Sequence, residues 1–135
     1  NHERMVHLRA QKVAGIANDI PEAECENPTG DVLVLGWGST RGAITGAVNR
    51  LRAKGEEVSA CFLRHVNPLP RNLGDLMKGF RKVIIPEMNL GQLALLVRAR
   101  YLVDAESFTK VQGRPFGSEE IEARLIQVLE ELTKA

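Results

Sequence analysis

A buried strand that ends in polar side chains is the part of this sequence best suited to chemistry. A β-branched run at residues 83–85 leads through a proline to Glu87, Asn89 and Gln92, and a nearly all-apolar segment follows. This order predicts a parallel strand, a turn and a helix, and open α/β sheets bind ligands at the carboxyl ends of their strands. Glu87 could act there as a general base. In the alternative interpretation, Glu87 and Asn89 hydrogen-bond their own turn or a neighbouring domain.

A glycine-rich turn at residues 36–42 follows another predicted strand and opens a predicted helix over residues 41–54. Its pattern is G-x-G-x-x-x-G, one residue longer than the dinucleotide-binding fingerprint. Ser39 or Thr40 could cap the helix. Backbone amides at the helix start, with Arg41 beside them, could hold a phosphate of CoA or NADP, or a carboxylate of a partner. In the simpler interpretation, the glycines only permit a tight turn.

Histidines give weaker signals. His65 and Asn67 follow the strand that precedes the Glu87 strand in the sequence, and they could approach Glu87. The string HERMVH places His2 and His7 five residues apart, about 140° around a helix, whereas a zinc protease needs histidines four apart on one face. We therefore predict that this chain alone supplies no complete catalytic set, no metal site and no cofactor site.

Composition restricts the class of protein. The 135 residues are 44% hydrophobic and 26% charged, which is typical of a globular domain. Cys25 and Cys61 lack C-x-x-C spacing, so we expect free thiols and a cytoplasmic location, with Cys61 in the core. No apolar run approaches the roughly 20 residues of a membrane span. With a formal net charge of +1, we expect neither nucleic-acid nor membrane binding.

Basic residues are concentrated between positions 41 and 82. Nine lysines and arginines face only three acidic residues there, whereas the rest of the chain has nine basic and fourteen acidic residues. This segment could attract an anionic ligand or an acidic partner, or its charges could simply solvate helix faces.

Strand and helix patterns alternate from residue 31 onward. We predict strands near residues 32–35, 57–63, 82–86 and 107–111, and helices near residues 3–18, 41–54, 73–80, 91–103 and from 118 onward. This alternation predicts an α/β fold, in three layers, α/β/α, with a mainly parallel sheet. We assign residues 1–30 to an N-terminal helix and lead-in linker, with a short edge strand at residues 23–26, and residues 31–135 to the α/β domain.

Two apolar features predict covered surfaces. The helix at residues 91–103 is apolar almost all round, so we predict that it is largely buried. Leu90 and Phe116 are candidates for an apolar patch that other domains cover, and such a patch could drive homodimer formation in isolation. The chain begins with Asn1 rather than methionine, so we expect it to be a piece of a longer polypeptide.

Seven strings, in order, resemble the C-terminal domain of the α subunit of 2-oxoacid:ferredoxin oxidoreductases, and within that family the 2-oxoglutarate type. They are NHERMV at residues 1–6, KVAGI at 12–16, LGWGST at 35–40, LRHVNPLP at 63–70, PEMNLGQL at 86–93, YLVDA at 101–105 and VQGRPF at 111–116. The likeness covers nearly the whole chain.

The resemblance implies a complex that oxidatively decarboxylates a 2-oxoacid to an acyl-CoA and passes the electrons to ferredoxin. It implies thiamine diphosphate, magnesium and an iron–sulfur cluster for the complex, none of them in this domain. The implied partners are the upstream domain of the same α polypeptide, the β subunit, ferredoxin and CoA. The implied fold is that of the transketolase C-terminal domain, with a structural and assembly role, so we expect the isolated chain to be inactive.

On this interpretation, residues at the strand ends are candidate contacts with a partner or ligand. They are Ser39, Thr40, Arg41, His65, Asn67, Glu87, Asn89 and Gln92. Two alternatives stay open: a binding module for a phosphate ligand such as CoA or NADP, and the C-terminal domain of another thiamine diphosphate enzyme.

Overall fold

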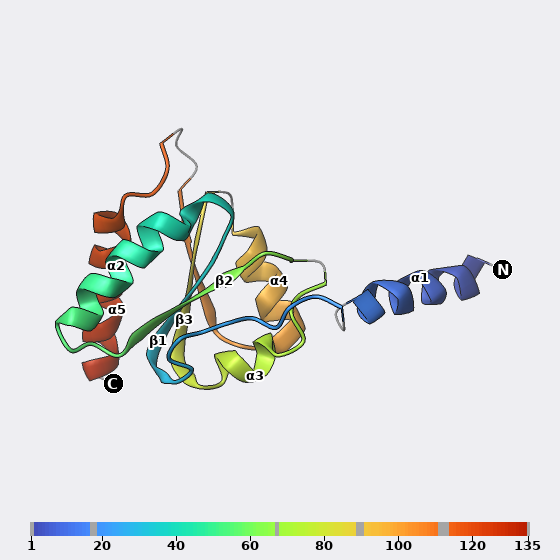
Figure 1. Ribbon diagram of the computed structural model, residues 1–135, viewed down its shortest axis with the longest axis horizontal. Coiled ribbons are helices and arrows are strands. Elements are labelled where there is room, and N and C mark those ends of the chain that lie inside the picture. The colour runs from blue at the N-terminus through green and yellow to red at the C-terminus, as the bar shows by residue number, and fades with distance from the viewer. Residues whose placement is uncertain (1, 17–18, 67, 89–90, 111–113, 135) are drawn as a thin grey trace.

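Four parallel strands form one sheet in the computed structural model of the chain, which describes residues 2–16, 19–66, 68–88, 91–110 and 114–134 (Figure 1). The strand order is β2-β1-β3-β4. The strands are β1 (Gly30–Trp37), β2 (Val58–Leu63), β3 (Phe80–Glu87) and β4 (Ala105–Thr109). In register, Val34 of β1 lies between Ala60 of β2 and Ile84 of β3.

Helices cover both faces of this sheet. Helices α2 (Arg41–Ala53) and α5 (Ser118–Lys134) lie on one face, and α3 (Leu73–Met77) and α4 (Gln92–Tyr101) lie on the other (Figure 1). Val32 and Val34 pack against the α2 and α5 side, whereas Leu33 and Leu35 pack against the α3 and α4 side. Helices on both faces of a parallel sheet confirm the predicted three-layer α/β fold. Burial on both faces also explains why β1 is a continuous apolar run in the sequence. None of the described helices is both long and apolar enough to cross a bilayer.

Element bounds follow the sequence pattern to within three residues at each end. The helix predicted to continue to Phe80 ends at Met77, and Phe80 begins β3 instead. Strand β4 begins at Ala105, two residues before its predicted start. Gly55 adopts φ +91° directly after the last turn of α2, as expected of a helix stop.

Helix α1 (His2–Ile16) extends away from the rest of the chain (Figure 1). The lead-in segment that follows α1 then runs beside the outer edge of β2. There it forms a single antiparallel β-bridge, a backbone pairing between Cys25 and Cys61, rather than the predicted edge strand. The Asn72 side chain completes the attachment: its Oδ1 accepts a hydrogen bond from the Ala23 N–H at 2.7 Å, and its Nδ2 donates to the Ala23 carbonyl at 2.8 Å.

The prediction that the apolar helix after β3 is largely buried is wrong. Only one side of α4 packs on the sheet, through Leu93, Ala94 and Val97. Leu95 is 68% exposed and Leu96 is 42% exposed. The pattern is apolar on both sides of the helix, but the described part of the chain packs against one side alone.

The predicted apolar patch does not include Phe116. This ring is buried against the core beneath α2 and α5, with its centroid 5.1 Å from that of Phe108. Aromatic burial of this kind needs the tertiary contact with β4, which no local pattern reveals. Leu90, the other residue proposed for the patch, lies outside the described residues.

Candidate functional site

Glu87 is a buried carboxylate that binds its own turn. It is 1% exposed and ends β3. Its Oε1 accepts a hydrogen bond from the Leu93 N–H at 2.7 Å, and its Oε2 accepts from the Ala94 N–H at 3.1 Å. These amides begin α4, where a helix leaves N–H groups without intrahelical partners and favours negative charge. Gly91 precedes them at φ +86°, a conformation that glycine adopts without strain.

The glycine turn and Glu87 line one small crevice. Its volume is about 150 Å³, and it is bordered by residues 37–40, Glu87 and Met88. The Thr40 hydroxyl donates a hydrogen bond to the Trp37 carbonyl at 3.1 Å. Neither Ser39 nor Thr40 caps α2 with its side chain, so the capping prediction is wrong; a 3₁₀ turn, η1 (Gly38–Thr40), leads into the helix instead.

This crevice is poorly suited to a phosphate group. A phosphate in this crevice would share it with the Glu87 carboxylate, and like charges repel. A volume of about 150 Å³ is also below the usual range of roughly 300–1,000 Å³ for a small-molecule site. The geometry therefore counts against CoA, NADP or a diphosphate cofactor at the glycine turn.

The other candidate residues lie in different places. His65 lines a separate depression of about 190 Å³ with Glu24, Arg64 and other residues, because β1 separates β2 from β3 in the sheet. The structure thus does not bring His65 into the Glu87 crevice. Gln92 is an exposed residue at the first position of α4, and Arg41 faces a third, larger cavity. Asn67 and Asn89 lie outside the described residues.

The two cysteines are free, and Cys61 lies in the core as predicted. Burial raises the pKa of the Cys61 thiol to about 12, so little of it is the reactive thiolate at neutral pH. Two thiols cannot supply the four ligands of a typical iron–sulfur cluster. In the described part of the chain, no three His, Cys, Asp or Glu side chains come together as a metal site.

The buried Cys61 thiol predicts a loss of stability at alkaline pH. Its folded-state pKa of about 12 exceeds the ordinary value of about 9, so its stabilising contribution is complete below pH 9. Above pH 9 the unfolded chain releases the proton and the folded chain keeps it. The free energy of unfolding therefore falls by about 1.4 kcal/mol per pH unit from this group.

Urea denaturation of the wild type and Cys61→Ala from pH 7 to pH 11 measures this effect. The difference between the two free energies should be constant up to pH 9 and should shrink above it. Other titrating groups cancel in the difference. A difference that does not change with pH would contradict the assignment.

Comparisons with known proteins give a consistent result. No family model matches the chain. It is 47% identical over 123 residues to 2-oxoglutarate oxidoreductase subunit KorA of Mycobacterium tuberculosis, covering 90% of this chain and 18% of that protein. It is 34% identical over 135 residues to the α subunit of 2-oxoacid:ferredoxin oxidoreductase 2 of Aeropyrum pernix, covering 95% of this chain and 21% of that protein.

Comparison with solved structures leads to the same family as the sequence comparison. The fold matches 2-oxoglutarate:ferredoxin oxidoreductase of Magnetococcus marinus with a TM-score of 0.86 and 31% identity, over 94% of this chain and 23% of that one. A split-gene transketolase matches with a TM-score of 0.63 and 15% identity, over 81% of this chain and 41% of that one, which shows a shared fold. The chain spans about a fifth of the length of the curated relatives just described. It therefore belongs to the family of 2-oxoacid:ferredoxin oxidoreductase α subunits, as a homologue of one part of them.

Proposed function

We propose that this chain is a structural and assembly domain of a 2-oxoglutarate:ferredoxin oxidoreductase α subunit. The observation that carries this proposal is the exposed apolar side of α4. Leu95 and Leu96 are 68% and 42% exposed, and Leu102, which follows the helix, is 89% exposed. Such a group of leucines is expected where another protein surface covers it.

Leu102 strengthens this interpretation. Its φ is +56°, a left-handed conformation that leucine adopts only at a cost in free energy. A glycine would end the helix there without strain. A leucine that is both strained and exposed in the isolated domain is explained by contact with a partner.

The β subunit is the partner that we assign to the α4 face. A separate subunit must offset the translational and rotational entropy lost on association, and burial of apolar side chains does so. We assign α1 to the upstream domain of the same α polypeptide. Residues 1–30 then form a connecting helix and linker, and residues 31–135 form the assembly domain. Helix α1 supports this division because Met5, Leu8 and Ile16 are exposed in the chain alone.

The strand-end residues fit a contact role better than a catalytic one. The Glu87 carboxylate is engaged by two backbone amides and is shielded from solvent. Ser39, His65 and Gln92 are exposed at that end of the sheet, where a neighbouring domain would meet them. We therefore place the reacting groups of the complex outside this domain.

The proposed complex converts 2-oxoglutarate and CoA to succinyl-CoA and passes electrons to ferredoxin. The Magnetococcus marinus enzyme, whose structure contains 2-oxoglutarate, CoA and succinyl-CoA, supports this choice of substrate. The described residues bring no three His, Cys, Asp or Glu side chains together as a metal site, so we assign thiamine diphosphate, magnesium and the iron–sulfur cluster to other parts of the complex. The two free thiols support a cytoplasmic location.

The isolated chain is expected to be inactive. We would mix it with 2-oxoglutarate, CoA, thiamine diphosphate, Mg²⁺ and a viologen dye as electron acceptor, and follow dye reduction. No reduction above the buffer rate is expected, while a complete α/β complex reduces the dye under the same conditions. Dye reduction that depends on both the isolated chain and 2-oxoglutarate would contradict the assembly role.

A further inference from the structure

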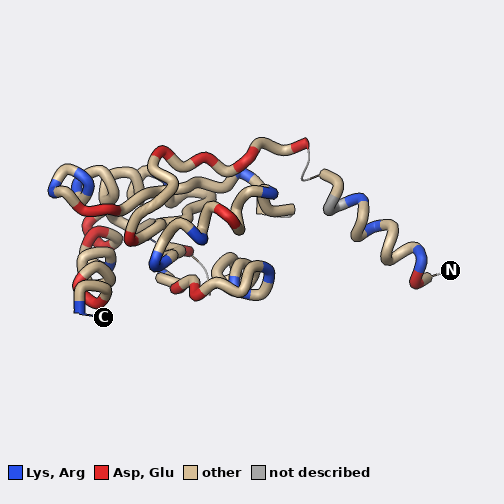
Figure 2. The backbone as a smooth tube through the Cα atoms, turned by 90° about the horizontal axis from the view of Figure 1, so that it is seen from below, with Lys and Arg blue, Asp and Glu red and all other residues tan. Residues whose placement is uncertain are grey.

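The basic residues between positions 41 and 82 fall into two groups in the folded chain. Figure 2 shows acidic and basic residues interspersed over the body of the domain. Six of the nine basic side chains form ion pairs: Arg50 and Lys54 with Glu122, Arg71 with Glu22, Lys78 with Asp75, Arg81 with Asp31, and Lys82 with Asp104 and Glu106. The other three, Arg41, Arg52 and Arg64, form no ion pair with the described residues, and all three line one cavity.

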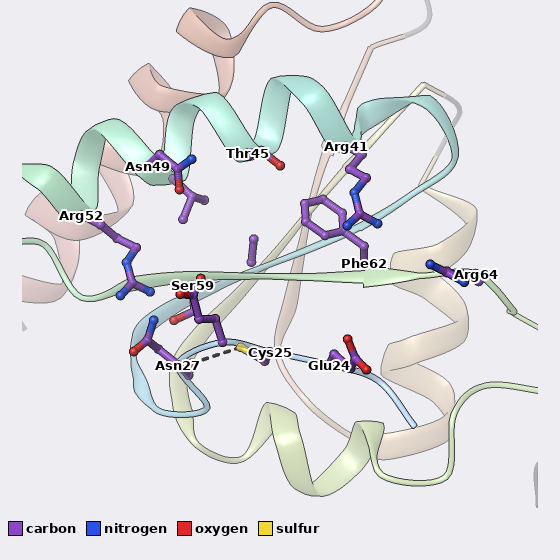
Figure 3. A pocket seen from close by; sticks show the side chains of 13 residues that line it. Glu24, Cys25, Asn27, Arg41, Thr45, Asn49, Arg52, Ser59, Phe62 and Arg64 are labelled. Atoms are coloured by element: carbon purple, nitrogen blue, oxygen red, sulfur yellow. Dashed lines mark hydrogen bonds between the residues drawn. The ribbon is translucent and has the colours of Figure 1, made fainter. Parts of the chain in front are cut away.

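That cavity lies between α2, β2 and the lead-in segment (Figure 3). Its volume is about 500 Å³, within the usual range of roughly 300–1,000 Å³ for a small-molecule site. Val48, Ala60 and Phe62 give it an apolar wall. It is separate from the crevice at Glu87, which has different lining residues.

Two of the arginines that line the cavity, Arg41 and Arg52, are held by contacts with other lining residues. The Arg41 guanidinium lies 4.6 Å from the centroid of the Phe62 ring, a stacked cation–π arrangement. The Arg52 guanidinium faces the Asn27 side-chain amide and donates to its oxygen in the amide orientation that satisfies both groups. This contact, the backbone β-bridge between residues 25 and 61, and the Asn72 side chain together fix the lead-in segment as one wall of the cavity. Figure 3 shows Arg52 at one end of the cavity and Arg64 at the other.

The arginines and glutamates that line the cavity determine which kind of anion it can bind. Arg41 and Arg64 can bind a phosphate through charge-assisted hydrogen bonds. Glu24 and Glu26 line the cavity as well, and they would repel a bare anion or an acidic peptide. They would instead accept hydrogen bonds from hydroxyl or amino groups. A ligand for this cavity therefore carries a phosphate, several donors and a flat ring that stacks on Phe62 or Arg41.

We propose that this cavity binds a nucleoside phosphate. The phosphates meet Arg41 and Arg64, the ribose hydroxyls and any exocyclic amine face Glu24 and Glu26, and the base stacks on the Arg41–Phe62 pair. This site goes beyond the assembly role and does not depend on it, since binding to the chain needs no other subunit.

Isothermal titration calorimetry of the 135-residue chain with ADP tests the proposal. Saturable binding is expected, and adenosine, which lacks phosphate, should bind at least about tenfold more weakly. Arg64→Gln should weaken ADP binding by at least about tenfold, since Arg64 is exposed and its replacement disturbs no ion pair. Arg50→Gln is the matched control: Arg50 belongs to α2 but pairs with Glu122 and does not line the cavity, so ADP affinity should stay within twofold.

Circular dichroism and thermal melting would first establish that both variants fold. The proposal would be overturned by no heat at millimolar ADP with the folded wild type, by adenosine binding as tightly as ADP, or by equal losses in Arg64→Gln and Arg50→Gln. Inorganic phosphate that binds as tightly as ADP would also overturn it, because the base and ribose would then contribute nothing.

Discussion

Glu87→Ala is expected to lower the free energy of unfolding of this chain by roughly 3 kcal/mol. The substitution removes both acceptors of the Leu93 and Ala94 amides and leaves two buried N–H groups without partners. Each such group costs about 1–3 kcal/mol. The loss also removes a negative charge from the start of α4, where the helix dipole favours one. Urea denaturation monitored by circular dichroism measures the change.

Two further variants isolate the cause. Glu87→Gln retains one oxygen acceptor and should cost about half as much as Glu87→Ala. Glu119→Ala removes an exposed glutamate from the first turn of α5 and should change the free energy by less than about 0.5 kcal/mol. If Glu87→Ala cost no more than Glu119→Ala, the Glu87 carboxylate would not be holding α4 to β3.

Leu95→Lys is expected to weaken association of a complete α subunit with its β subunit by roughly 100-fold. A leucine that becomes buried in an interface contributes about 2 kcal/mol, and a lysine in its place also brings a charge that must be desolvated. About 2.7 kcal/mol corresponds to that 100-fold change. Sedimentation of α and β mixtures over a range of concentrations gives the dissociation constants.

The stability of the isolated domain should hardly change in this variant, because Leu95 is 68% exposed there. Ile126→Lys serves as the control for added charge at an exposed aliphatic residue, since Ile126 is 38% exposed on α5, at the opposite face of the sheet. It should leave association unchanged. Equal association by wild type and Leu95→Lys would show that the α4 face is not the β-subunit contact.

The layers of this fold are predictable from the sequence because each strand carries its own signal. The apolar runs at residues 32–35 and 83–85 require helices on both sides of a sheet, and the intervening segments have helical periodicity. The role of Glu87 in its turn is also predictable. A carboxylate just before a helix can accept hydrogen bonds from the unpaired backbone N–H groups of the first helical turn, here six and seven residues away.

The arrangement of the site depends on strand order, which local patterns do not encode. Placing β1 between β2 and β3 separates His65 from the Glu87 crevice, although consecutive strands often pair. The cavity at Arg41 and Arg64 forms only when the lead-in segment reaches β2, through the Asn72 side chain 49 residues away. The sequence did not single out Asn72, because an isolated asparagine near a helix start reads as an ordinary capping residue.

The exposed apolar side of α4 is only partly predictable from its pattern. A ten-residue helix that is apolar on both sides predicts either full burial within its own domain or one side for the sheet and one for a neighbour. The sequence does not choose between them, since the choice depends on how many elements this chain can place over the helix.

Turnover per assembled complex in the Leu95→Lys variant tests the assembly role most directly. Subunit concentrations are raised until sedimentation shows complete α/β assembly, and the rate of 2-oxoglutarate-dependent dye reduction is then measured. The assembly role predicts that kcat per complex lies within twofold of the wild type once assembly is complete. A fully assembled variant complex that has lost most of its turnover would contradict it, because this domain would then act in the chemistry itself.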